Sequence, residues 1–177
     1  MPENDSPHHS LTVVCNGMKL TRINTMDLND WNQILHVSRA EDHNMINRLV
    51  TDFRAGTNRF DAPGEALLAV LMGREVVAVA GLNREPDESV PWAGRVRRLY
   101  VMPDFRGRGL GRRLVDAIVA EARARFGILS VNVGTSEARG FYEHLGFTPV
   151  EHSSITHTKD LAHNKSFHHI FDTTEKR

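Results

Sequence analysis

A short loop of alternating arginines and glycines is the part of this sequence best suited to chemistry. It reads Arg106-Gly107-Arg108-Gly109-Leu110-Gly111 and lies between a predicted strand and a predicted helix. Because glycine has no Cβ, spaced glycines let backbone N–H groups converge on one anion, and the helix N-terminus adds roughly half a positive charge. Residues 95–125 hold nine arginines and three acidic residues, a net +6. We therefore predict an anion site here that suits phosphate oxygens.

Other glycine-rich nucleotide loops fit less well. A P-loop needs Gly-Lys followed by Ser or Thr, which is absent, and the dinucleotide fingerprint needs a glycine where Leu114 stands. Taken alone, the loop is also compatible with a glycine-rich turn flanked by solvated arginines.

Three other residue types could take part in catalysis or metal binding: tyrosine, histidine and cysteine. Tyr142 recurs at helical spacing after Ala138, and on that pattern alone it is better interpreted as a core aromatic. The ten histidines lie without acidic partners at ligand spacing, so surface histidines are favoured over a metal site. Cys15 is the single cysteine; it excludes an internal disulfide and has no activating neighbour, so it is a poor nucleophile.

The elements that must position these residues follow from periodicity. We predict a strand over 18–24, a helix capped by Thr25, and a helix over 44–53. A hairpin follows, over 66–72 and 76–82, then a loop over 83–94 and a strand over 95–102. The longest apolar stripe runs from Leu110 to Phe126, followed by a strand over 128–133 and a short helix ended by Gly146. A last hairpin is expected over 147–151 and 155–161.

Length and composition indicate one domain. The chain has 177 residues and a formal net charge of zero, which argues against a polyanionic partner for the whole chain. Its first residues carry acids where a signal peptide would carry basic residues, and no apolar run reaches membrane-spanning length, so we expect no membrane partner and a cytoplasmic location. We expect a loose segment over 1–15, the domain over 16–162, and a polar tail over 163–177.

Two strings together resemble a known family. The string from Leu99 to Gly111, with its Arg-x-x-Gly-x-Gly spacing, resembles the acyl-CoA signature of the GNAT superfamily of N-acetyltransferases. The string from Ala138 to Phe147 resembles the same family's short helix ending in Leu-Gly-Phe. The resemblance covers residues 65–150 well and residues 18–60 by element order only.

The resemblance implies an α/β (α+β) fold: a mostly antiparallel mixed sheet with one splayed parallel strand pair, flanked by about four helices. It also implies acetyl-CoA as co-substrate, with no metal, and a bulged central strand whose free backbone groups bind the cofactor and stabilise the oxyanion. Tyr142 would protonate the departing thiolate. Thr135 stands where the family often has Asn, which puts a side-chain contact there in doubt, although Thr can cap the helix. The implied cofactor-binding residues are Leu99, Tyr100, Val101, Arg106, Gly107, Arg108, Gly109, Leu110, Gly111, Arg112 and Thr135.

The acceptor is expected to be a primary amine on a small molecule that attacks the thioester directly in a ternary complex. Relatives often carry a basic carboxylate on the strand before the loop, but Arg95, Arg97 and Arg98 stand there. The candidates for the general base are therefore Asp87, Glu88, Glu151 and His152, or a water chain.

Alternatives remain open on this reasoning. A non-catalytic acyl-CoA sensor would keep the loop but lack amine activation. A nucleic-acid-binding module would use the arginine cluster, but the neutral charge and few aromatics disfavour it. Acetylation of protein N-termini is not excluded, and a homodimer is left open.

Overall fold

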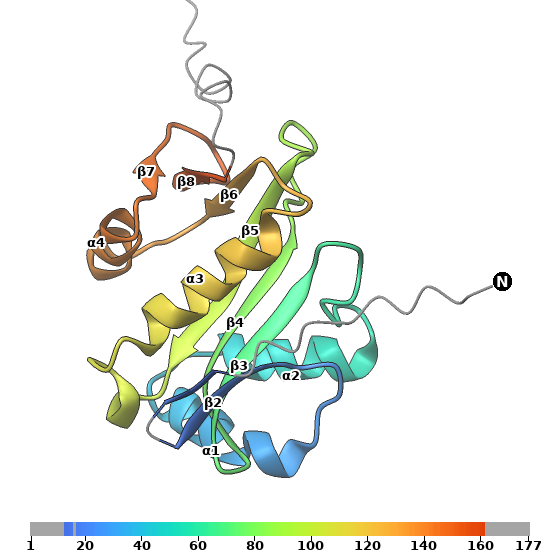
Figure 1. Ribbon diagram of the computed structural model, residues 1–177, viewed down its shortest axis with the longest axis vertical. Coiled ribbons are helices and arrows are strands. Elements are labelled where there is room, and N and C mark those ends of the chain that lie inside the picture. The colour runs from blue at the N-terminus through green and yellow to red at the C-terminus, as the bar shows by residue number, and fades with distance from the viewer. Residues whose placement is uncertain (1–12, 16, 162–177) are drawn as a thin grey trace, which may run out of the picture.

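A mixed eight-stranded sheet forms the centre of the molecule (Figure 1). The computed structural model describes residues 13–15 and 17–161. The strands lie in the order β1-β2-β3-β4-β5-β6-β8-β7, and all neighbours are antiparallel except β5 and β6. Their bounds are β1 Val13–Cys15, β2 Met18–Arg22, β3 Ala66–Met72, β4 Glu75–Arg84, β5 Ala93–Val101, β6 Ile128–Val131, β7 Thr148–Pro149 and β8 His157–Asp160.

Helices cover both faces of this sheet (Figure 1). Helices α1 (Leu28–Ala40) and α2 (Met45–Ala55) pack on one face, and α3 (Leu110–Ala122) packs on the other. A 3-10 turn, η1 (Pro103–Phe105), leads from β5 toward α3, and α4 (Ser136–His144) follows β6. The predicted stripe of α3 is confirmed, since Leu110, Leu114 and Ile118 are at most 1% exposed. The fold class implied by the resemblance is therefore confirmed.

Three predicted boundaries were wrong: the start of α1, the loop between β4 and β5, and the end of β6. Asp27, not Thr25, caps α1, because its carboxylate accepts a hydrogen bond from the Asn29 N–H at 3.0 Å. The loop expected over 83–94 is shorter, since β4 and β5 stay paired as far as Arg84 and Gly94. Val133 does not extend β6, because its N–H donates to the Thr156 hydroxyl instead of to a strand.

The first strand begins earlier in the chain than the sequence pattern indicated. Val13–Cys15, which we expected in the loose segment, pair as β1 with Met18–Leu20. The tail expected over 163–177 lies outside the described residues.

The parallel pairing of β5 with β6 is very short. It spans only Ala93–Arg95 against Ile128–Ser130. Beyond Arg95, β5 keeps its β4 neighbour but has no partner on the β6 side. One extra residue enters β5 between Arg97 and Tyr100, and Arg98 there has φ +59°, the left-handed conformation of a bulge. The expected bulge and splay are both confirmed.

A buried ion pair lies at the root of this splay. The Glu85 carboxylate, with a fully buried side chain, contacts Arg95 Nε at 2.9 Å and accepts hydrogen bonds from the Ser130 hydroxyl and the Asp87 N–H. Arg95 in turn donates to the Ser154 carbonyl. Since Ser130 is on β6 and Arg95 on β5, Glu85 joins the two parallel strands where their pairing ends.

Removing Glu85 should therefore cost far more than removing an exposed partner. Glu85→Ala leaves the Arg95 charge, 13% exposed, without its counter-ion, so we expect the free energy of unfolding to fall by about 3–5 kcal/mol. In the matched control, Glu121→Ala breaks the exposed pair with Arg22 and should cost below about 1 kcal/mol. Urea unfolding of both variants tests this, and equal losses would contradict it.

Candidate active site

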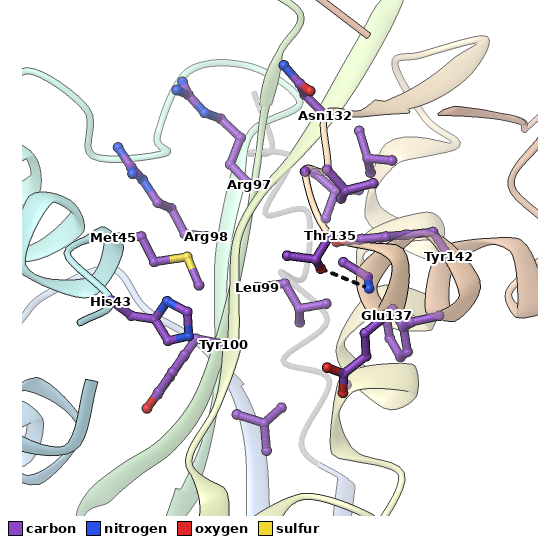
Figure 2. Close-up of a pocket in the computed structure, with 18 of the residues that line it drawn as sticks. His43, Met45, Arg97, Arg98, Leu99, Tyr100, Asn132, Thr135, Glu137 and Tyr142 are labelled. Atoms are coloured by element: carbon purple, nitrogen blue, oxygen red, sulfur yellow. Dashed lines mark hydrogen bonds between the residues drawn. The ribbon is translucent and has the colours of Figure 1, made fainter. Parts of the chain in front are cut away.

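The gap between the diverging strands is a large cavity. It encloses about 720 Å³ and lies between β5 on one side and β6 with α4 on the other (Figure 2). Of the residues predicted to bind the cofactor or act in catalysis, the lining includes Leu99, Tyr100, Val101, Arg106, Gly111, Thr135 and Tyr142.

The β5 edge offers backbone groups to this cavity. Because β6 has already turned away, the N–H and C=O groups of residues 96–101 that face it have no strand partner. Of these, the Val101 carbonyl accepts a hydrogen bond from Arg106 Nε at 2.9 Å. Unpaired strand edges bind extended ligands through main-chain hydrogen bonds, which is the arrangement that pantetheine and a thioester carbonyl need.

The glycine loop continues from this edge. Gly107 and Gly109 have φ +73° and +75°, and a Cβ on either would meet nothing within 4 Å, so these glycines serve the backbone conformation. Gly109 is the N-cap of α3, and no side chain caps the helix. The first N–H groups of α3 therefore lack acceptors within the helix, as an anion site requires. Gly107, Arg108, Gly109, Leu110 and Arg112 belong to this loop but not to the cavity lining.

Arg106 is held by a carboxylate that sequence reasoning missed. Its guanidinium donates to both oxygens of Glu41 at 2.9 and 2.7 Å, and the Tyr100 hydroxyl donates to Glu41 at 2.6 Å. The bonds from Arg106 and then Tyr100 lower the pKa of Glu41. Burial, and then the bond to Glu41, raise the pKa of Tyr100. The three side chains thus join the end of α1 to the start of the phosphate loop.

Two other arginines of the loop, Arg108 and Arg112, do not contact Glu41. Arg108 lies over the Phe105 ring at 5.4 Å, and Arg112 contacts Asp116 at 3.7 Å one helical turn away. Both Arg112 and Asp116 are more than half exposed, so this pair contributes little to stability and leaves Arg112 available.

Tyr142 lies at the cavity wall and is 5% exposed. Its ring packs edge-on against Phe141 and Phe147, each at a centroid distance of 5.2 Å. Among the described residues, none forms a hydrogen bond with its hydroxyl. Burial raises the pKa of the phenol, so Tyr142 stays a neutral proton donor in alkaline solution.

Thr135 and Thr156 fix the opposite wall. The Thr135 hydroxyl accepts from the Ala138 N–H at 3.2 Å, which confirms it as the cap of α4 (Figure 2). The Thr156 hydroxyl donates to the Val131 carbonyl and accepts from the Val133 N–H. His157, 2% exposed, contacts Thr156 and Glu143, so the Thr-His pair serves to position the segment after β6.

None of the four predicted base candidates lines the cavity. Asp87 instead accepts hydrogen bonds from Ser89 and Ser154, which lower its pKa to about 2 and make it a poor proton acceptor. The residues that do line it from the α1–α2 side are His43 and Met45. The His43 ring packs edge-on to Tyr100 at 6.0 Å. No sequence motif marks His43. Only its position between the two predicted helices that became α1 and α2 could have suggested it.

The described residues contain neither a metal cluster nor a membrane-spanning helix. Within residues 13–15 and 17–161, no group of three or more His, Cys, Asp or Glu side chains could hold a metal ion. No helix in the same residues is both long and apolar enough to cross a membrane.

Comparison with known sequences links these features to a family. Residues 63–149 match the family model for the acetyltransferase (GNAT) domain. A 5-NmdU N-acetyltransferase of Pseudomonas phage PaMx11 is 46% identical over 48 residues, which are 27% of this chain and 34% of the relative. The chain spans about a third or less of the length of the curated relatives it matches.

Solved structures resemble nearly the whole described domain. A protein of Exiguobacterium sp. 255-15 assigned to the acetyltransferases is 29% identical at a TM-score of 0.69, covering 81% of this chain and 93% of its own. The yncA protein of Salmonella typhimurium, solved with its cofactor acetyl-CoA, shares the fold at a TM-score of 0.60 and 16% identity, covering 85% of this chain and 98% of its own. With the splayed strands and the glycine loop in the matched segment, this chain belongs to the GNAT family of acetyltransferases.

Proposed function

We propose that this protein transfers the acetyl group of acetyl-CoA to the nitrogen of a primary amine on a small molecule. The observation that carries the proposal is the succession of two backbone features: the unpaired β5 edge leads, through η1 and the glycine loop, to the uncapped N-terminus of α3. A thioester carbonyl and a pyrophosphate are the two groups of acetyl-CoA that these features suit.

The cofactor-binding assignment follows the same path. The N–H groups at the start of α3 and of Gly107 to Gly109 would hold the pyrophosphate, with Arg108 and Arg112 as mobile cations beside it. The backbone of Leu99 to Val101 would bond pantetheine and the thioester carbonyl. Thr135 uses its oxygen to cap α4 but can still donate its hydroxyl proton, so its contact with the cofactor also stays a proposal.

Direct attack in a ternary complex explains the placement of the remaining groups. The amine nitrogen forms a bond to the carbonyl carbon, the carbonyl oxygen gains negative charge, and the C–S bond then breaks. A backbone N–H of the β5 edge stabilises the oxyanion, and the Tyr142 hydroxyl gives its proton to the departing sulfur.

The attacking amine must also lose a proton. His43 lines the cavity on the side of α1 and α2, and histidine is the side chain best suited to accept a proton near neutral pH. We therefore assign this step to His43, directly or through water, in place of the four candidates taken from the sequence. A cytoplasmic location and a homodimer stay predictions.

Acetyl-CoA should stabilise the folded protein. At a concentration about 100-fold above its Kd, the expected gain is about 2.7 kcal/mol, measured as a shift in Tm. Gly109→Ala should weaken this effect, and Gly17→Ala is the matched control, since both glycines have φ +75° and open space at Cβ. The backbone strain of the two variants is similar, but only Gly109 lies at the phosphate loop.

Turnover is then followed as free thiol released with a panel of amines. No shift with acetyl-CoA would overturn the proposed function. A shift without thiol release from any amine would indicate the acyl-CoA sensor instead.

Tyr142→Phe should lower kcat by at least about tenfold, because the ring packing is kept while the proton donor is lost. The Kd of acetyl-CoA should stay within about twofold, measured by calorimetry. Since burial raises the pKa of Tyr142, its ionisation should cause no fall in the wild-type rate between pH 7 and about pH 10. An unchanged kcat in Tyr142→Phe would remove the acid role.

A further inference from the structure

Two adjacent arginines reach into the cavity from the same side of β5. In a regular strand the side chains of Arg97 and Arg98 would point to opposite faces, but the bulge at Arg98 breaks this alternation. In Figure 2 both side chains extend on the side of His43 and Met45, away from Thr135 and Tyr142. They therefore belong to the acceptor half of the cavity, on the side of α1 and α2.

These two arginines are poorly neutralised. Within the described residues, the Arg97 guanidinium forms no hydrogen bond or ion pair. Arg98 has a single contact, at 3.5 Å, to Asp52, whose own side chain is 39% exposed. Arg95 and Arg106, by contrast, are each matched by a carboxylate at 2.9 Å or less. The acceptor half thus holds positive charge that the protein does not cancel.

Nearby groups do not change this balance. Arg48, on α2, adds a third positive charge close enough to Arg98 to act on it. Glu41 already accepts from Arg106 and Tyr100, and Glu137 belongs to α4, on the opposite wall (Figure 2). Near Arg98, the single negative charge of Asp52 therefore faces the positive charges of Arg48, Arg97 and Arg98.

Holding these charges together is unfavourable without a ligand. The Arg98 side chain is 15% exposed, and burial, followed by repulsion from Arg97 and Arg48, lowers its pKa. Its backbone is also in the left-handed conformation, which is unfavourable for a residue other than glycine. An anion between the guanidinium groups would offset the repulsion and form charge-assisted hydrogen bonds.

We propose that the amine acceptor also carries a negatively charged group, a carboxylate or a phosphate, which Arg97 and Arg98 bind. The inference rests on the proposed function and names the substrate class: small amino acids or phosphorylated amines. The anionic end lies at residues 97–98, so the amine end of the same molecule faces the backbone of Leu99 to Val101, which we assign to the thioester carbonyl.

Matched pairs of amines test this proposal. Each amino acid in the panel is compared with its own amide, which tests for recognition of a carboxylate. O-phosphoethanolamine is compared with ethanolamine, which tests for recognition of a phosphate. Binding to the CoA-saturated protein is measured by calorimetry, and turnover by thiol release. The anionic member of at least one pair should bind at least about tenfold more tightly than its neutral partner.

Variants then assign the effect to residues. Arg97→Gln should remove most of the preference for the anionic member by raising its KM, while KM for acetyl-CoA stays within about twofold. Arg98→Gln should act in the same direction. Arg123→Gln, an exposed residue just beyond α3, removes the same charge outside the cavity and should leave the preference intact.

The outcomes separate this inference from the proposed function. If an anionic amine binds in an Arg97-dependent way but no thiol is released, the transferase activity fails while the anion site stands. If neutral partners bind as tightly, if Arg97→Gln keeps the preference, or if no anionic amine in the panel binds, the anion site is overturned.

Discussion

The end of pairing between β5 and β6 is the constraint on which the rest of this molecule depends. After three residues of parallel ladder the two strands separate, and backbone groups that a sheet would satisfy are left facing a cavity. Such groups are costly when buried without partners, so the separation is stable only where solvent or a ligand can bond to them. The sheet is therefore incomplete between β5 and β6, at the place where we propose that acetyl transfer occurs.

Three separate features determine where the two strands stay paired and where they separate. At the root, Glu85 joins Arg95 and Ser130, so the pairing is firm as far as it goes. Along β5, the bulge at Arg98 shifts the register against β4. On the other wall, the Thr156 hydroxyl bonds the Val131 carbonyl and the Val133 N–H, which holds the chain after β6 against the start of β8. Glu85 thus fixes the last paired position, while the bulge and Thr156 shape the two strands beyond it.

Sequence reasoning predicted the parts of the fold whose signals are local. The α3 stripe, the Gly146 cap and the glycine loop are read from spacing alone, because helix periodicity and positive φ depend on neighbouring residues. Glu41 and His43 could not be found in this way, since they meet Tyr100 only after α1 has packed on the sheet, 57 to 59 positions away along the chain. The base candidates lie outside the cavity lining for the same reason: Asp87 is near in sequence to β5, but its hydrogen bonds hold it beside Ser89 and Ser154.

The Glu41 carboxylate has a further consequence for how the two substrates are sensed. It is shared by Arg106, which opens the phosphate loop, and by Tyr100, whose ring contacts His43. If the loop shifts to accept a pyrophosphate, Glu41 must follow it or give up two charge-assisted bonds. The same carboxylate therefore ties the position of the glycine loop to the end of α1, where His43 lines the cavity.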